Sequence, residues 1–232
     1  KYPVFAGLVA NCFLPAEVAV ENAEVLLNQK IDGTNFIRAK QIIDAQNNTN
    51  WTREKDTSER QSGNKSVGAI TEKLLKRCLD DFVDGENFFR VKQPDVESYG
   101  DFVLMCLPNN LFISAKSNKA KERLLTSGFT TDIIAAGFFD NYKEFISAPK
   151  MRHYQRAGFL ALYLPDVPVS GEQVEKGNNT YQQVIEDYAK KGIERPTNIN
   201  GKPLIRKLSD LYNDLTGLLI EKNIVKRTIT NF

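Results

Sequence analysis

The sequence has one histidine, His153, and lacks the common nucleotide-binding and hydrolase motifs. A single histidine is too few for a two-histidine zinc site or a His-Glu-x-x-His protease, and its setting does not fit a nucleophile triad. Neither GxxxxGK[ST], GxGxxG nor GxSxG occurs. We therefore expect any chemistry to depend on carboxylates, lysine and a metal ion that prefers oxygen ligands.

Cysteine and long apolar runs are also scarce. Cys12, Cys78 and Cys106 are widely spaced without a CxxC pair, and the last two lie in apolar runs. Buried free thiols in a reducing, cytoplasmic environment are expected. No run approaches the roughly 20 apolar residues that cross a bilayer, and the first residues lack the pattern of a signal peptide. We expect no membrane partner.

Charge of either sign is not in excess. The 31 Lys and Arg residues almost balance 29 Asp and Glu residues, and 41% of the 232 residues are hydrophobic. This composition is typical of a globular protein, and the length favours a single domain over residues 1–232. Binding to a polyanion would therefore need local clusters of basic residues.

Hydrophobic periodicity predicts a helical N-terminal part. Residues 16–46 show helical spacing that breaks at Asp32-Gly33, which predicts two helices and a turn. Residues 47–65 are polar and almost free of aliphatic side chains, which predicts a long loop or arm. Residues 66–83 predict an amphipathic helix. Its apolar stripe consists of Ile70, Leu74, Leu75, Cys78 and Leu79.

The remainder alternates predicted strands and helices. Strands are predicted at 87–93, 102–106, 111–116, 157–164 and 224–232, the second and third forming a hairpin around "LPNN". Helices are predicted at 117–125, 130–146, 180–192 and 203–223. This order indicates the α/β class, with a mixed central sheet flanked by helices.

The hairpin carries opposite charges at its open end. Asp101 lies eight residues before Asn109 in the turn and Lys116 seven after it, so pairing of the strands brings them close together. Ser114 shares a face with Lys116 because side chains alternate along a strand. Such a pair can hold a metal ion and orient a water for phosphodiester hydrolysis. The alternative is an ordinary surface ion pair.

Glu72 is a further acidic candidate, on the predicted helix before the hairpin. It lies beside the apolar stripe, and Gly68 precedes it by four residues. A glycine near a helix start allows close approach of backbone or ligand. The alternative is a solvated glutamate and an incidental glycine.

Residues 65–120, with "VGAITEKLL", "YGDFVLMC" and "LFISAKSN", resemble the core of the PD-(D/E)xK nucleases, in particular the type II restriction endonucleases. The resemblance implies a restriction-endonuclease-like core and Mg²⁺-dependent cleavage of sequence-specific double-stranded DNA. It also implies a homodimer in which each subunit cuts one strand. Asp101 would bind Mg²⁺, Lys116 would act on the attacking water, and Glu72 would assist at the metal. The backbone carbonyl of Ala115 would be a further ligand.

The sequence departs from this family at Ser114, where the pattern requires Asp or Glu. Some restriction enzymes have a Ser-x-Lys strand and take the missing carboxylate from a helix. The candidates here are Glu72, Glu122 and Asp132. Asp95, in a literal Pro-Asp pair, is a rival to Asp101 but lies fourteen residues before the turn.

Several basic clusters could contact DNA phosphates. Residues 149–156 also contain His153 and Tyr154 and could form a recognition segment. The alternative for each cluster is a solvated charged surface. The predicted DNA-binding residues are Lys119, Lys121, Arg123, Arg152, Arg156, Arg53 and Arg60.

Two other functions stay open at this point. One is a repair or recombination nuclease with the same core. The other is a non-catalytic DNA-binding protein in which Ser114 marks a lost metal site. The leucines of 203–223, at positions 208, 211, 215 and 218–219, could form a dimer interface or pack into the core.

Overall fold

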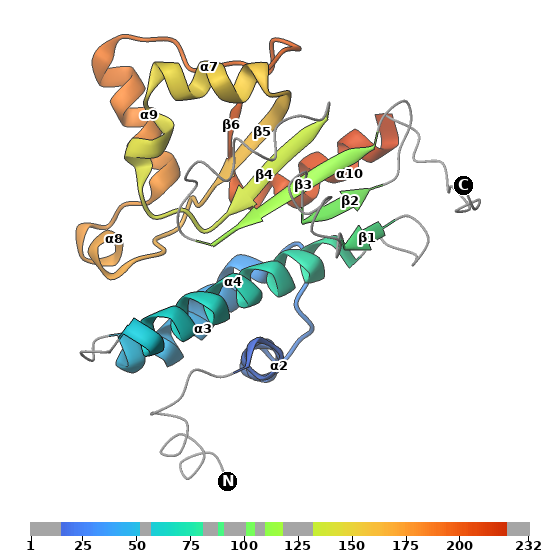
Figure 1. Ribbon diagram of the computed structural model, residues 1–232, viewed down its shortest axis with the longest axis vertical. Coiled ribbons are helices and arrows are strands. Elements are labelled where there is room, and N and C mark those ends of the chain that lie inside the picture. The colour runs from blue at the N-terminus through green and yellow to red at the C-terminus, as the bar shows by residue number, and fades with distance from the viewer. Residues whose placement is uncertain are drawn as a thin grey trace, which may run out of the picture. The chain divides into compact units, whose positions relative to one another are not determined.

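The computed structural model describes residues 15–51, 57–80, 88–90, 101–104, 110–117 and 132–221. The chain divides into two compact units, Lys1–Asp80 and Asp81–Phe232, where the sequence predicts one domain. Each unit is described by itself below, and Figure 1 names their helices and strands.

The N-terminal unit contains helices α2 (Ala16–Leu27), α3 (Phe36–Trp51) and α4 (Thr57–Leu79). The predicted break at Asp32-Gly33 is confirmed. Helix α2 ends at Asn28, whose φ of 54° stops the helix, and the Asp32 carboxylate accepts the amide of Thr34 at 2.8 Å.

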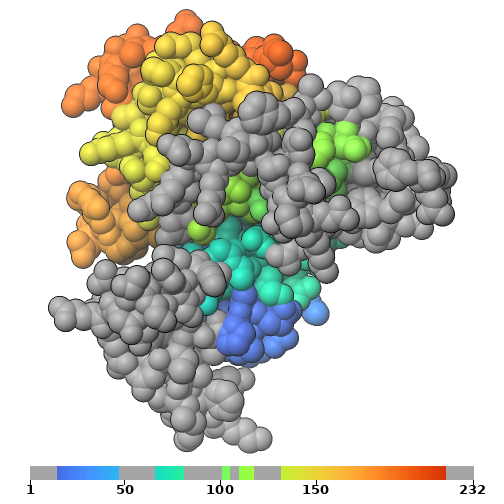
Figure 2. Space-filling view, in the orientation of Figure 1, coloured from blue at the N-terminus to red at the C-terminus, as the bar shows by residue number. Residues whose placement is uncertain are grey.

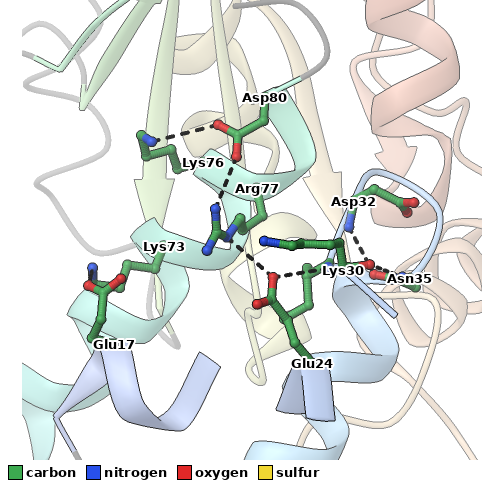
Figure 3. Close-up of polar contacts among 10 residues, drawn as sticks. Glu17, Glu24, Lys30, Asp32, Asn35, Lys73, Lys76, Arg77 and Asp80 are labelled. Atoms are coloured by element: carbon green, nitrogen blue, oxygen red, sulfur yellow. Dashed lines mark hydrogen bonds and ion pairs between the residues drawn. The ribbon is translucent and has the colours of Figure 1, made fainter. Parts of the chain in front are cut away.

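Ion pairs join α2 to α4 at the surface of this unit. Glu17 pairs with Lys73, and Glu24 accepts from Arg77 at 3.5 Å (Figure 3). The Glu24 carboxylate also accepts the backbone N–H of Ile31 at 3.2 Å. These contacts fix the register of the two helices, while the buried side chains between them supply most of the stability.

The apolar stripe of α4 is confirmed, but the polar loop predicted over 47–65 is wrong where the structure describes it. All five stripe residues are buried. Residues 47–51 end α3 and residues 57–65 begin α4. The segment contains no proline and one glycine, Gly63. It also contains three good helix formers, Glu59, Arg60 and Gln61. Lack of an apolar stripe indicates only that a helix has no core-facing side, and does not indicate a loop.

The C-terminal unit is built on a mixed six-stranded sheet in the order β1 to β6. Strands β1, β2 and β3 are antiparallel, and β3 to β6 are parallel. The α/β class and the hairpin are therefore confirmed. The strands are β1 (Phe88–Arg90), β2 (Phe102–Leu104), β3 (Leu111–Lys116), β4 (Ile133–Gly137), β5 (Phe159–Leu164) and β6 (Ile205–Lys207).

Two helix predictions in this unit are wrong in part. The predicted helix at 130–146 contains β4, whose five residues are all buried, and only a 3₁₀ turn, η2 (Tyr142–Phe145). A short apolar run buried on both faces does not show the period of a strand. The predicted helix at 203–223 begins with β6 and the 3₁₀ turn η3 (Leu208–Asp210), and α10 covers Leu211–Glu221.

Helices lie on both faces of the sheet (Figure 1). On one face η2, α7 (Ala148–Arg156) and α9 (Thr180–Lys191) pack on β4 and β5, with Phe145, Tyr154 and Val184 in the shared core. On the other face Tyr163 of β5 bonds Asp214 of α10. Helix α8 (Gly171–Lys176) precedes α9, which ends at Gly192 with a φ of 63°.

The other predictions are resolved as far as the structure extends. Cys78 is a buried free thiol as expected. Leu208, Leu211 and Leu215 are buried within the single chain, so this part of the leucine stripe packs into the core. None of the described helices combines the length and apolar character that spanning a bilayer requires. Residues 118–131 and 222–232, Cys12 and Cys106 lie outside the described residues.

Candidate functional site

The candidate site lies where β2 begins and β3 ends. Phe102 pairs with Ile113, so Asp101 is opposite Ser114. Because side chains alternate, Asp101, Ser114 and Lys116 project from one face of the sheet. Phe112, which belongs to the same set, packs against the core beneath η2, α7 and α9. The three side chains therefore lie on the face that these helices cover.

The structure brings Asp101 and Lys116 together, as predicted. The Lys116 ammonium donates to Asp101 Oδ2 at 3.3 Å, and the Ala115 backbone N–H donates to the same oxygen at 2.6 Å. About a quarter of each side chain is exposed (20% for Lys116, 28% for Asp101). Within the described residues, Asp101 Oδ1 accepts no hydrogen bond. One carboxylate oxygen is thus held by the protein while the other stays available to a ligand.

The carbonyl of Ala115 lies on the same side of β3 as Asp101. In a strand, the N–H and C=O of one residue point to the same neighbouring strand, and the Ala115 N–H points to Asp101. The Ile113 carbonyl, two residues earlier, accepts the Asp101 N–H at 2.9 Å and shows the same orientation. Asp101 and the Ala115 carbonyl could therefore coordinate one cation.

Gly137 fixes the end of β3 from the opposite side. It pairs with Lys116 on β4, and a Cβ at this position would lie 2.2 Å from the Lys116 carbonyl oxygen. Any larger residue would therefore displace the strand end that carries the lysine. Gly137 was not among the residues predicted from the sequence. The available signal was a glycine at the end of an apolar run, which often marks close backbone approach.

Asp132 is excluded as the replacement for the missing carboxylate, contrary to one of the sequence hypotheses. Its carbonyl accepts the Phe112 N–H at the beginning of β4. Ala115 is opposite Ala136, four residues beyond Asp132, or about 13 Å along a strand. An aspartate side chain is too short to bridge that distance.

The other predicted site residues have different outcomes. Ser114 is completely buried, so it offers no exposed oxygen to a hydrated ion. Glu72 is half-buried on α4 of the N-terminal unit, and its part in the site stays a prediction. Arg60 lies on α4, and Arg152, His153 and Arg156 are exposed residues of α7. Residues outside the described ranges are Glu122, Asp95, Lys119, Lys121, Arg123 and Arg53.

A second polar cluster, on the opposite face of the sheet, was not found from the sequence. Asp214 of α10 accepts the Tyr163 hydroxyl at 2.9 Å and Arg206 at 2.8 Å. Burial raises the pKa of the Tyr163 hydroxyl above its usual value, and the nearby Asp214 carboxylate raises it further. The one available signal was a tyrosine within the apolar run of β5. This cluster satisfies a buried hydroxyl and therefore has a structural explanation.

The donors at the candidate site fit part of a Mg²⁺ site. Mg²⁺ keeps several waters in most proteins and is held by one or two carboxylates. Asp101 and the Ala115 carbonyl supply one carboxylate and one neutral oxygen. Across the described ranges, no group of three or more His, Cys, Asp and Glu side chains is arranged to hold a metal ion. Glu72 and Glu122 stay predictions for a second carboxylate.

Comparisons of the chain with known protein families, curated proteins and solved structures found no match.

Proposed function

We propose that the protein is a Mg²⁺-dependent endonuclease that hydrolyses double-stranded DNA, of the type II restriction class with a PD-(D/E)xK-like core. The observation that carries the proposal is the geometry of Asp101 and Lys116. They lie 3.3 Å apart at adjacent strand ends. Among the described residues Asp101 Oδ1 accepts no hydrogen bond, and the Ala115 carbonyl is directed toward the same neighbouring strand. The mixed sheet and the hairpin also support it, because the sequence resemblance implies both.

Each residue has a distinct role in this mechanism. Asp101 Oδ1 and the Ala115 carbonyl would hold Mg²⁺, which supplies positive charge to the phosphate and lowers the pKa of water. Lys116 would orient the attacking water and offset the negative charge that develops on the phosphate oxygens. The Ala115 N–H and Gly137 would position the carboxylate and the lysine without contacting DNA.

The second carboxylate separates this proposal from its main rival. Ser114 replaces an acid and is completely buried, an observation that also favours a non-catalytic DNA-binding protein. If the site is catalytic, the sequence resemblance predicts that one of two candidates, Glu72 or Glu122, supplies the missing carboxylate. Glu72→Gln and Glu122→Gln should then differ, with one variant about a hundredfold slower in cleavage and the other close to wild type.

Plasmid cleavage tests the proposal directly. A restriction endonuclease should produce discrete fragments with Mg²⁺, and EDTA should prevent their formation. A smear, or preferential cutting of branched DNA, would instead indicate a repair or recombination nuclease. Binding of DNA without cleavage under any metal condition would indicate the non-catalytic rival. Size-exclusion chromatography with light scattering tests the homodimer that the sequence resemblance implies.

A further inference from the structure

A rigid turn over residues 197–203 lies between α9 and β6. Its centre is Asn198, which is buried although the turn is at the surface. The Asn198 side-chain amide donates to the Leu160 carbonyl of β5 at 2.8 Å. Its oxygen accepts the backbone N–H of Asn200 at 2.9 Å and of Lys202 at 3.0 Å. One buried side chain therefore fixes the turn to the sheet.

The tip of this turn presents an isoleucine to solvent. Ile199 is 78% exposed, the most exposed of the large hydrophobic residues that the structure describes, and the exposed Asn200 follows it. A single exposed isoleucine is common on protein surfaces. Here, however, the bonds of Asn198 hold Ile199 in place. The turn thus offers a fixed apolar tip next to an amide side chain.

Cations lie on α7 and on the chain that forms the turn. The Gln155 side chain of α7 donates to the Thr197 carbonyl, so the turn and α7 are neighbours. Figure 1 shows the segment after α9 running beside α7, and Figure 2 shows both at one surface, in yellow and dark orange. We name this the α7–turn surface, defined by Arg152, Arg156, Arg195, Ile199, Asn200 and Lys202.

The four cations of this surface, three arginines and Lys202, differ from Lys176 and Lys191 of the same unit. None of them forms an ion pair within the described part of the chain, and the acid next to them in sequence is Glu194. Lys176 and Lys191, by contrast, each pair with the acid one turn earlier, at 2.5 and 2.6 Å. A group of exposed, unneutralised cations favours a polyanion.

We infer that the α7–turn surface is a second contact for double-stranded DNA, separate from the cleavage site. The arginines and Lys202 contact phosphates, and Ile199 and Asn200 enter a groove. Apolar side chains contact the thymine methyl group and asparagine pairs with adenine, so both residue types suit base edges. The inference rests on the proposed function, which supplies DNA as the partner.

The α7–turn surface and the candidate site lie toward opposite ends of the parallel strands. Helix α7 covers the face of the sheet on which Asp101 and Lys116 lie. The turn is hydrogen-bonded to Leu160 of β5, which is level with the first residue of β4. Lys116 is opposite Gly137, the last residue of β4. Four residues of strand span about 13 Å, or about four base pairs at about 3.4 Å each.

Binding without cleavage tests the cations. We would titrate a labelled random-sequence duplex with the full chain in EDTA at several salt concentrations. Arg152→Ala/Arg156→Ala should weaken binding about tenfold at moderate salt and reduce the slope of log K against log salt by about 2. The matched control is Lys176→Ala/Lys191→Ala, which removes two paired cations and should change affinity less than about twofold. Thermal unfolding checks that the variants fold.

Specific cleavage tests the tip. Ile199→Ala/Asn200→Ala should leave binding to the random duplex unchanged but slow formation of discrete plasmid fragments about tenfold or more. The inference about the α7–turn surface would be overturned if the arginine variants bind the duplex like wild type. It would also be overturned if the wild type prefers RNA or anionic vesicles to the duplex. A wild type that binds the duplex through these arginines but never cleaves would overturn the nuclease and leave the surface standing. A wild type that neither binds nor cleaves would overturn both.

Discussion

Two ion pairs on opposite faces of one sheet show how similar contacts can have different explanations. Asp214 bonds Arg206 at 2.8 Å and also accepts the hydroxyl of Tyr163, a residue that is 97% buried and needs a partner. Asp101 and Lys116 are 3.3 Å apart, and no buried side chain depends on them in the described residues. The two pairs are similarly exposed, and an exposed ion pair by itself contributes little stability. The Tyr163 hydroxyl therefore gives the first pair a structural explanation. Asp101 of the second pair accepts only the Ala115 N–H and Lys116 among the described residues, and the proposed function assigns this pair its role at the metal.

Removing the charges of the second pair should have the largest effect. Asp101→Asn keeps an oxygen that can accept the Ala115 N–H but loses the charge that binds Mg²⁺, and Lys116→Met keeps the aliphatic chain. Each should lower the rate of DNA cleavage about a thousandfold. The melting temperature should stay close to that of wild type. Wild-type cleavage in either variant would contradict the assignment of the site.

Substitution of Gly137 should affect both stability and cleavage. In Gly137→Ala the new methyl group would meet the Lys116 carbonyl, so the strands must separate at a cost of about 1–3 kcal/mol. Urea unfolding measures this loss. Gly217→Ala is the matched control in the same unit, because open space surrounds Gly217 on α10. It should raise the free energy of unfolding by about 0.5–1 kcal/mol. Equal effects of the two substitutions would refute the close approach.

Loss of the structural pair should lower stability but spare catalysis. Asp214→Ala leaves the buried Tyr163 hydroxyl without its acceptor and should cost about 1–2 kcal/mol of unfolding free energy. Tyr163→Phe removes the group that needs the partner. If the two side chains act together, the double variant loses less than the sum of the single variants. Additive losses would show that the bond is unimportant.

Alkaline pH should produce the smallest change, through two buried tyrosines. Burial, with a smaller contribution from Glu144, raises the pKa of Tyr154 to about 12, and the pKa of Tyr163 is also raised from the ordinary value of 10.0. Both folded-state pKa values exceed the unfolded value, so their contribution is complete below pH 10 and declines as pH rises above it. Unfolding free energies from pH 9 to 11 should decline less steeply in Tyr163→Phe, by about 1 kcal/mol at pH 11. Parallel curves would contradict this.

Local patterns predicted the hairpin and much of its geometry. The two apolar runs around Pro108 and Asn109 indicate strands joined by a turn, and strand pairing then places Asp101 near Lys116. The break at Asp32-Gly33 and the stripe of α4 were predictable for the same reason. Each depends on residues that are close together in the sequence.

Features that depend on distant residues could not be predicted. Strand β4 is a short apolar run, and only its burial between β3 and β5 distinguishes it from a helix. Position 137 requires glycine because β4 pairs with β3 and brings this residue close to the Lys116 carbonyl. Asn198 contacts Leu160, 38 residues earlier, and no sequence pattern links them. The loop predicted at 57–65 was wrong for another reason, because the helix propensity of these residues outweighed their lack of an apolar stripe.

The most direct test compares Asp101→Asn with Asp214→Asn in one plasmid-cleavage assay with Mg²⁺, at a temperature where both variants are folded. The two changes are chemically identical and lie on opposite faces of the same sheet. We predict that Asp101→Asn loses cleavage about a thousandfold with an unchanged melting temperature, while Asp214→Asn melts earlier and still cleaves at close to the wild-type rate. Equal cleavage by the two variants would contradict the account.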